Sequence, residues 1–84
     1  MRARVYVTLK EGVLDPAGVA TAGGLKSLGF DEVHGVRLGK FIEVELDDSA
    51  EGFDAASARA RVTEMCEKLL ANTVIETYRI ELEG

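Results

Sequence analysis

Residues 32–48, EVHGVRLGKFIEVELDD, contain the clearest pattern in the sequence. From Val36 onward, apolar side chains fall on every second position, which is the period of a strand with one buried face. These residues are Val36, Leu38, Ile42, Val44 and Leu46. A two-residue hairpin at Gly39 and Lys40 would send the apolar residues after the turn to the opposite face from those before it. The unbroken phase therefore favours one long strand, with a hairpin over residues 33–46 as the alternative.

Two glycines interrupt this long strand. Gly35 and Gly39 weaken it and allow it to bend or to bulge. Lys40 shares a face with the apolar residues, where an unpaired ammonium group would be costly. We expect a bulge at Gly39 to turn Lys40 outward beside Arg37, which creates a small basic surface on an acidic chain. Arg37, Gly39 and Lys40 are therefore the candidate partner-interface residues, with solvated charges at a bend as the alternative.

Length and composition limit the possible classes of function. The 84 residues suffice for a single domain, residues 1–84. A chain of this length buries only about 60 to 65% of its unfolded surface, so we expect a second copy to add stability. The formal net charge of −5 argues against a nucleic-acid or anionic-membrane surface, because both need a basic face. One cysteine cannot form an internal disulfide, and no apolar run approaches the ~20 residues of a membrane span. We expect a reduced, cytoplasmic compartment.

The N-terminal part predicts a strand followed by a helix. Residues 3–9, ARVYVTL, alternate apolar and polar side chains, as a half-buried strand does. Asp15 is a favoured N-cap, and the proline after it suits the first helical position. Gly29 suits the left-handed conformation that often ends a helix. Gly23 and Gly24 weaken this helix, and we infer that these small residues let it lie close to the sheet.

The C-terminal part predicts a second helix and a third strand. Between residues 55 and 70, apolar side chains recur at spacings of three and four, which gives the stripe of an amphipathic helix. Three N-cap candidates leave the start of this helix open, namely Asp48, Ser49 and Asp54. Residues 74–82, VIETYRIEL, then alternate again as a strand.

The order β-α-β-α-β predicts an α+β fold. We expect a two-layer sandwich, in which both helices lie on one face of a largely antiparallel three-stranded sheet with a long, bent central strand. A βαββαβ ferredoxin-like fold is the alternative. Open sheet edges favour pairing between copies of the chain. The face away from the helices should be mostly polar with two aromatic residues: Tyr6, Thr8, Phe41, Glu43, Glu45, Thr77, Arg79 and Glu81.

The sequence shows no catalytic or metal-binding pattern. His34 is the only histidine, and no set of Cys, His, Asp and Ser has the spacing of a triad or a metal site. Cys66 lies in the apolar stripe of the second helix, where we expect an inert, buried thiol. We therefore name no catalytic, cofactor-binding or metal-binding residue.

Several short motifs follow one another along nearly the whole chain. They are VTLKEGVLDP at 7–16, LGF at 28–30, VRLGK at 36–40 with IE at 42–43, MCEKLLAN at 65–72, VIE at 74–76 and YRIE at 78–81. In order and spacing they resemble the PurS family of phosphoribosylformylglycinamidine (FGAM) synthase. Two departures concern helix ends: Thr73 stands where the family usually has proline, and Gly23-Gly24 stand where it tends to have better helix formers.

The resemblance implies a place in de novo purine (IMP) synthesis. There the complex converts formylglycinamide ribonucleotide (FGAR) to FGAM with ATP and glutamine, as a glutamine-dependent carbon–nitrogen ligase. In the family a glutaminase subunit, PurQ, releases ammonia, and a synthetase subunit, PurL, binds ATP with Mg²⁺. The resemblance implies that this chain is the small non-catalytic subunit. It would join PurQ to PurL as a homodimer or dimer of dimers, support ammonia transfer, and hold no cofactor itself.

Two other classes of protein remain open at this point. An ACT-like small-molecule-binding regulatory domain is also a compact α+β unit that dimerises through its sheets. A stand-alone enzyme of ferredoxin-like shape, such as an acylphosphatase, needs an arginine-lined phosphate loop after its first strand. Residues 10–12, KEG, do not resemble such a loop.

Overall fold

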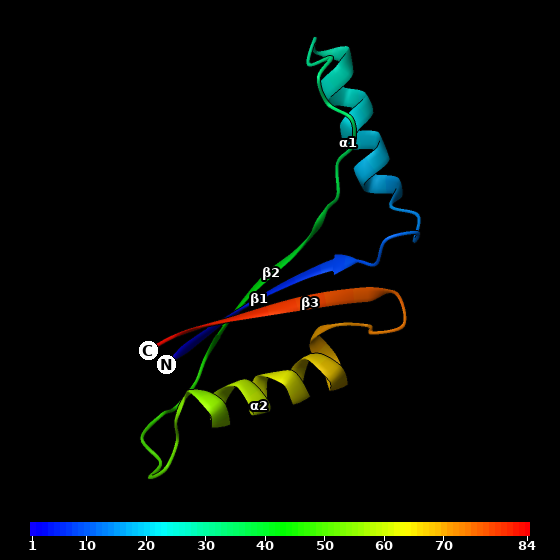
Figure 1. The fold of residues 1–84 in the computed structure, drawn as a ribbon. Coiled ribbons are helices and arrows are strands. Elements are labelled where there is room, and N and C mark those ends of the chain that lie inside the picture. The colour runs from blue at the N-terminus through cyan, green and yellow to red at the C-terminus, as the bar shows by residue number, and fades with distance from the viewer.

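The computed structural model describes residues 1–84 as three strands and two helices (Figure 1). A short π-helix, η1, continues α2, so that helical residues run from 55 to 70 as the sequence predicts. Neither α1 nor α2 has the length and apolar character needed to cross a membrane. The elements, in chain order, are β1 (Arg2–Leu9), α1 (Pro16–Ser27), β2 (Gly39–Glu45), α2 (Ala55–Met65), η1 (Cys66–Leu70) and β3 (Glu76–Glu83).

The three strands form one antiparallel sheet in the order β2-β1-β3. Val5 lies opposite Ile42 of β2 and Ile80 of β3, so the predicted apolar phases of all three strands meet on one face. This confirms the α+β class, the β-α-β-α-β order and the antiparallel sheet, and it excludes the ferredoxin-like order. The strand that is central in the sequence, β2, is an edge strand of the sheet, and β1 occupies the centre.

The core lies between α2 and the sheet. Its fully buried side chains come from β1 and from the α2–η1 helix: Ala3, Val5, Val7, Ala58, Val62 and Cys66. Asp54 is the N-cap of α2, its carboxylate accepting the Ser57 N–H, which settles the choice among the three candidates. Burial raises the pKa of the Cys66 thiol, in agreement with an inert cysteine.

The placement of α1 differs from the prediction. α1 stands beyond the end of the sheet instead of lying on it beside α2, and the molecule measures 55 × 25 × 14 Å (Figure 1). Gly18 is its only buried residue. The expectation of two helices on one face is therefore wrong for the single chain. The physical reason is that the inner stripe of α1 consists largely of Ala and Gly, which bury too little apolar surface to hold a helix against a sheet.

The long stretch around β2 is a single extended segment without a hairpin (Figure 1). Only Gly39–Glu45 pairs with β1, and residues 33–38 continue away from the sheet towards α1. The register with β1 runs without interruption from Gly39 to Glu45. The bulge expected at Gly39 is therefore absent.

Candidate functional site

An arm projects from the sheet. We define the arm as residues 13–38, which comprise α1 and the extended segment that returns from it, and its base as the place where residues 13–15 and 36–38 meet. Asp15 caps α1: its Oδ1 accepts the Gly18 N–H at 2.9 Å, and its Oδ2 accepts the Leu38 N–H at 3.0 Å. The Gly18 and Leu38 bonds lower the pKa of Asp15, and the positive charge of Arg37 adds to this effect.

Arg37 and Lys40, the two basic residues of the predicted partner interface, lie near the base of the arm, but their side chains contact different groups. The Arg37 guanidinium donates to the Leu9 carbonyl oxygen at the end of β1. The Lys40 ammonium lies 3.9 Å from the Glu76 carboxylate. Lys40 lies on the same face of the sheet as Ile42, as the alternation predicts. Its side chain is nevertheless 60% exposed, because α1 does not cover this end of β2. It avoids burial without the bulge that the sequence suggested, and whether these residues contact a partner stays a prediction.

The sheet face opposite α2 carries a cluster of aromatic and charged side chains, of which the sequence predicted the members but not the contacts. Its predicted polar and aromatic residues do share this face, but their contacts were not foreseen. The Tyr6 and Phe41 rings have centroids 5.1 Å apart, and the Arg79 guanidinium lies 4.2 Å from the Tyr6 ring centroid. Tyr6 donates to Glu81 at 3.1 Å, and Arg79 with Tyr6 lowers the pKa of Glu81. Phe41 remains 54% exposed, so this face presents an aromatic surface beside charged side chains that are paired with one another.

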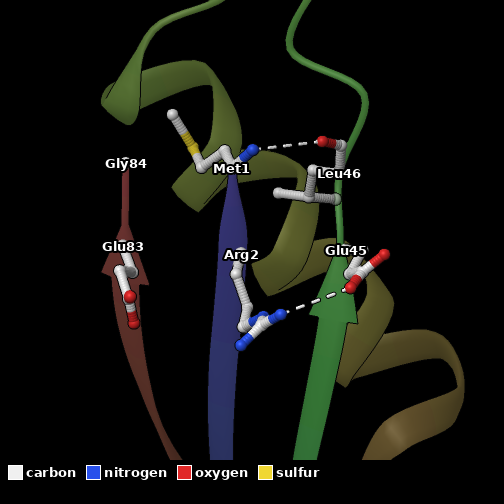
Figure 2. Close-up of a pocket in the computed structure, with 6 residues that line it drawn as sticks. All are labelled: Met1, Arg2, Glu45, Leu46, Glu83 and Gly84. Atoms are coloured by element: carbon white, nitrogen blue, oxygen red, sulfur yellow. Dashed lines mark hydrogen bonds and ion pairs between the residues drawn. The ribbon is translucent and has the colours of Figure 1, made fainter.

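Three shallow grooves mark the surface. One runs between α1 and the returning segment and includes Lys26 and His34. A second, at the two chain ends, is polar: Met1 donates from its ammonium group to the Leu46 carbonyl at 3.3 Å, and Arg2 pairs with Glu45 at 3.3 Å (Figure 2). The third, between α2 and β2, is mainly apolar and is lined by Val44, Arg61, Glu64, Met65, Lys68, Leu69 and Leu70. No group of three or more His, Cys, Asp or Glu side chains is arranged to hold a metal ion.

The two edges of the sheet differ in how open they are. On β3, the outward carbonyl of Ile80 accepts from the Arg59 guanidinium at 3.3 Å. On β2, Met1 and Leu46 form a hydrogen-bonded pair, so alternate residues of the strand direct their N–H and C=O groups away from β1. These outward residues are Gly39, Phe41, Glu43 and Glu45. The β2 edge is therefore the more accessible one for strand pairing.

Comparison with known proteins agrees with this architecture. The family model "PurS: Phosphoribosylformylglycinamidine (FGAM) synthase" matches residues 2–84. The PurS subunit of Synechocystis is 52% identical over 79 residues, which cover 94% of this chain and 75% of that protein. The Bacillus subtilis subunit is 50% identical over 82 residues, covering 98% and 92% of the two chains.

Solved structures give the same result. The B. subtilis PurS crystal structure has a TM-score of 0.83 at 48% identity, covering 99% of this chain and 98% of that one. Methanocaldococcus jannaschii PurS has a TM-score of 0.84 at 38% identity, covering 98% and 94%. A chain of the PurLQS structure from Thermotoga maritima has a TM-score of 0.76 at 29% identity, covering 95% and 93%. The motifs, the fold and these matches together show that the chain belongs to the PurS family of phosphoribosylformylglycinamidine synthase.

Proposed function

We propose that this chain is the small, non-catalytic subunit of FGAM synthase. In this role it bridges the glutaminase subunit PurQ and the synthetase subunit PurL, and it supports the transfer of ammonia between them during the ATP- and glutamine-dependent conversion of FGAR to FGAM. The observation that carries the proposal is the family match over residues 2–84. The related T. maritima chain was solved within PurLQS, and the comparisons give no support to an ACT-like sensor.

The division of chemistry within the complex follows from the same proposal. ATP and Mg²⁺ are used by the complex and held outside this chain, which works in the cytoplasm. Its histidine and cysteine do not form a reactive pair, since Cys66 is buried in the core while His34 lines the groove on the arm. The grooves are open and shallow, which suits contact with a protein surface more than the enclosure of a small molecule.

The exposed surface of the single chain supports a homodimer, or a dimer of dimers. The chain exposes 5887 Å², whereas a compact protein of 9.1 kDa exposes about 4,900 Å². The difference, about 1,000 Å², is close to the ~800 Å² that each partner loses in an interface of standard size. We propose that two copies meet through the open β2 edge and residues 33–38, so that the arm of each copy gains a surface to pack against.

Reconstitution tests the proposed function directly. The purified chain is mixed with PurQ and PurL from the same organism, the product is weighed by native mass spectrometry, and FGAM formation is measured with glutamine or with ammonium as the nitrogen source. The bridging role predicts a complex of all three subunits and a much larger stimulation with glutamine than with ammonium. Equal stimulation with either source, or no three-subunit complex, contradicts the proposal.

A further inference from the structure

The arm is attached to the sheet almost entirely at its base. Along α1, Val19 is 64% exposed, and Leu28 just after the helix is 76% exposed, so the helix does not pack on its own sheet. Figure 1 shows α1 and the returning segment standing clear of β1 and β3. Within the single chain, the contacts that set the direction of the arm must therefore lie where residues 13–15 and 36–38 meet.

Asp15 joins these two segments with a single carboxylate. One oxygen holds the first turn of α1 through Gly18, and the other holds the returning segment through Leu38, 23 residues later. Gly18 makes the close approach possible, since a Cβ there would collide with the Val36 carbonyl oxygen and lie 2.6 Å from Asp15 Oδ2. The helix start and the returning segment are therefore held in one fixed relation.

Arg37 connects the same point to the sheet. Its guanidinium donates to the carbonyl of Leu9, the last residue of β1. Because β1 is the central strand and carries three of the fully buried core residues, this contact ties the arm to the most rigid part of the chain. Asp15 and Arg37 thus form a short chain of contacts from α1 through the returning segment to β1.

Asp54 shows that helix capping does not require this arrangement. It caps α2 in the same way, with its Oδ1 accepting the Ser57 N–H at 2.9 Å. The groups that lower its pKa all lie within three residues of it. By contrast, Asp15 bonds a residue from a distant segment. The second oxygen of Asp15 therefore makes a contact between distant segments that helix capping alone does not require.

We propose that Asp15 is a positioning residue that fixes the direction of the arm and so presents α1 to the other subunits of the complex. The first half of this inference concerns the chain alone, and the second half rests on the proposed function. Serine is also a favoured N-cap but offers one oxygen instead of two. Asp15→Ser therefore removes the bond to Leu38 while keeping the cap, and Asp54→Ser is the matched control on α2.

Amide hydrogen exchange and ¹⁵N relaxation on the purified full-length wild-type and variant chains, without PurQ or PurL, test the first half. In Asp15→Ser, the Leu38 amide should exchange about fivefold faster, the factor expected for the loss of one hydrogen bond, and the α1 order parameters should fall. Asp54→Ser should change neither. An unchanged Leu38 amide in Asp15→Ser overturns the proposal. If Asp15→Ser does not fold, Asp15→Asn replaces it, because its amide keeps the size of the side chain and one acceptor oxygen.

Titration with PurQ and PurL tests the second half. The apparent Kd for assembly should rise about fivefold or more in Asp15→Ser and stay at the wild-type value in Asp54→Ser. If Leu38 exchanges faster in Asp15→Ser but assembly is unchanged, the second half of the proposal is wrong, because the contact made by Asp15 then does not present α1 to the other subunits. If the wild-type chain itself does not assemble, the proposed function fails, while the exchange measurements still decide whether Asp15 fixes the arm.

Discussion

Gly39 lies so close to Val7 that a Cβ on Gly39 would collide with the Val7 carbonyl oxygen and lie 2.8 Å from Thr8 Cγ2. Gly39 is therefore required by the close approach of β2 to β1, and not by a bulge. We expect Gly39→Ala to lower the free energy of unfolding by about 1–3 kcal/mol, the usual cost of forcing an extra methyl group into a packed site.

Gly35 provides the control for this substitution. A Cβ at Gly35 meets nothing within 4 Å, so Gly35→Ala should leave the unfolding free energy unchanged or slightly higher. Urea denaturation of the two variants measures the difference. Equal stabilities for Gly39→Ala and Gly35→Ala would show that the strands separate easily at this point.

Gly23 and Gly24 have open space around them in the single chain, since a Cβ at either meets nothing within 4 Å. Replacing each with alanine should therefore strengthen α1 by up to ~1 kcal/mol, the difference in helix propensity. Circular dichroism should show more helix in the isolated protein. If the same substitutions weaken assembly, the glycines serve a close approach of α1 to a partner surface; unchanged assembly places that side of α1 in solvent.

Much of this fold follows from local patterns in the sequence. The alternation in β1, β2 and β3, the cap at Asp15 and the left-handed Gly29, with a φ of +99°, all depend on neighbours a few residues apart. The position of α1 could not be predicted in this way, because small residues in a helix indicate that something approaches closely without indicating what.

The candidate site was predictable only in part for a related reason. The phase of Lys40 was correct, but the bulge inferred from it assumed that a helix covers that end of β2. The links from Asp15 to Leu38 and from Arg37 to Leu9 join residues 23 and 28 positions apart. Contacts between residues so far apart leave no periodic pattern in the sequence from which they could be predicted.

Tyr78 gives a prediction on the alkaline side. Its hydroxyl donates to Glu67 at 2.7 Å, and this bond raises the pKa of Tyr78 to about 12, with burial adding to the effect. Because the pKa is raised on folding, the stabilising contribution is fully present below the unfolded pKa near 10 and is lost as the pH rises through about 12. Ultraviolet titration should show one tyrosine ionising near pH 12, and Glu67→Gln should lower its pKa. Tyr78→Phe should remove that transition.

Asp15 gives the corresponding prediction in acid. Its pKa is lowered, first by the Gly18 and Leu38 amides and to a smaller extent by Arg37, so its contribution is present above the ordinary pKa of 3.8 and is lost as the pH falls through the lower folded value. Protection of the Leu38 amide in the wild type should therefore persist down to the ordinary pKa of 3.8 and decline only below it. Asp15→Ser, which lacks the carboxylate, should show no such decline. A wild-type Leu38 amide that stays protected after all carboxylates are protonated contradicts the role of the charge.

The basic pair Arg37 and Lys40 gives a prediction about association. The Lys40–Glu76 contact is long, and Lys40 is largely exposed, so Lys40→Ala should cost less than about 1 kcal/mol of stability. If Lys40 faces a carboxylate on a partner subunit, its loss should slow assembly and reduce the dependence of assembly on salt. Arg37→Ala should in addition loosen the arm, because it removes the contact with Leu9. Assembly of both variants at the wild-type rate at every salt concentration would show that neither residue contacts a partner subunit.

The open β2 edge allows the proposed dimer to be tested with one N–H group. Glu43 lies in a pair with Arg4 that is not hydrogen-bonded, so its N–H points away from β1. Proline is tolerated at such a position of an edge strand but cannot donate to a second copy. Glu43→Pro should therefore retain the sheet, as judged by circular dichroism, and sediment as a monomer at micromolar concentration. Glu43→Ala loses the same ion pairs with Arg2 and Arg4 but keeps the N–H, so it should remain a dimer. A dimeric, folded Glu43→Pro would show that the copies meet elsewhere.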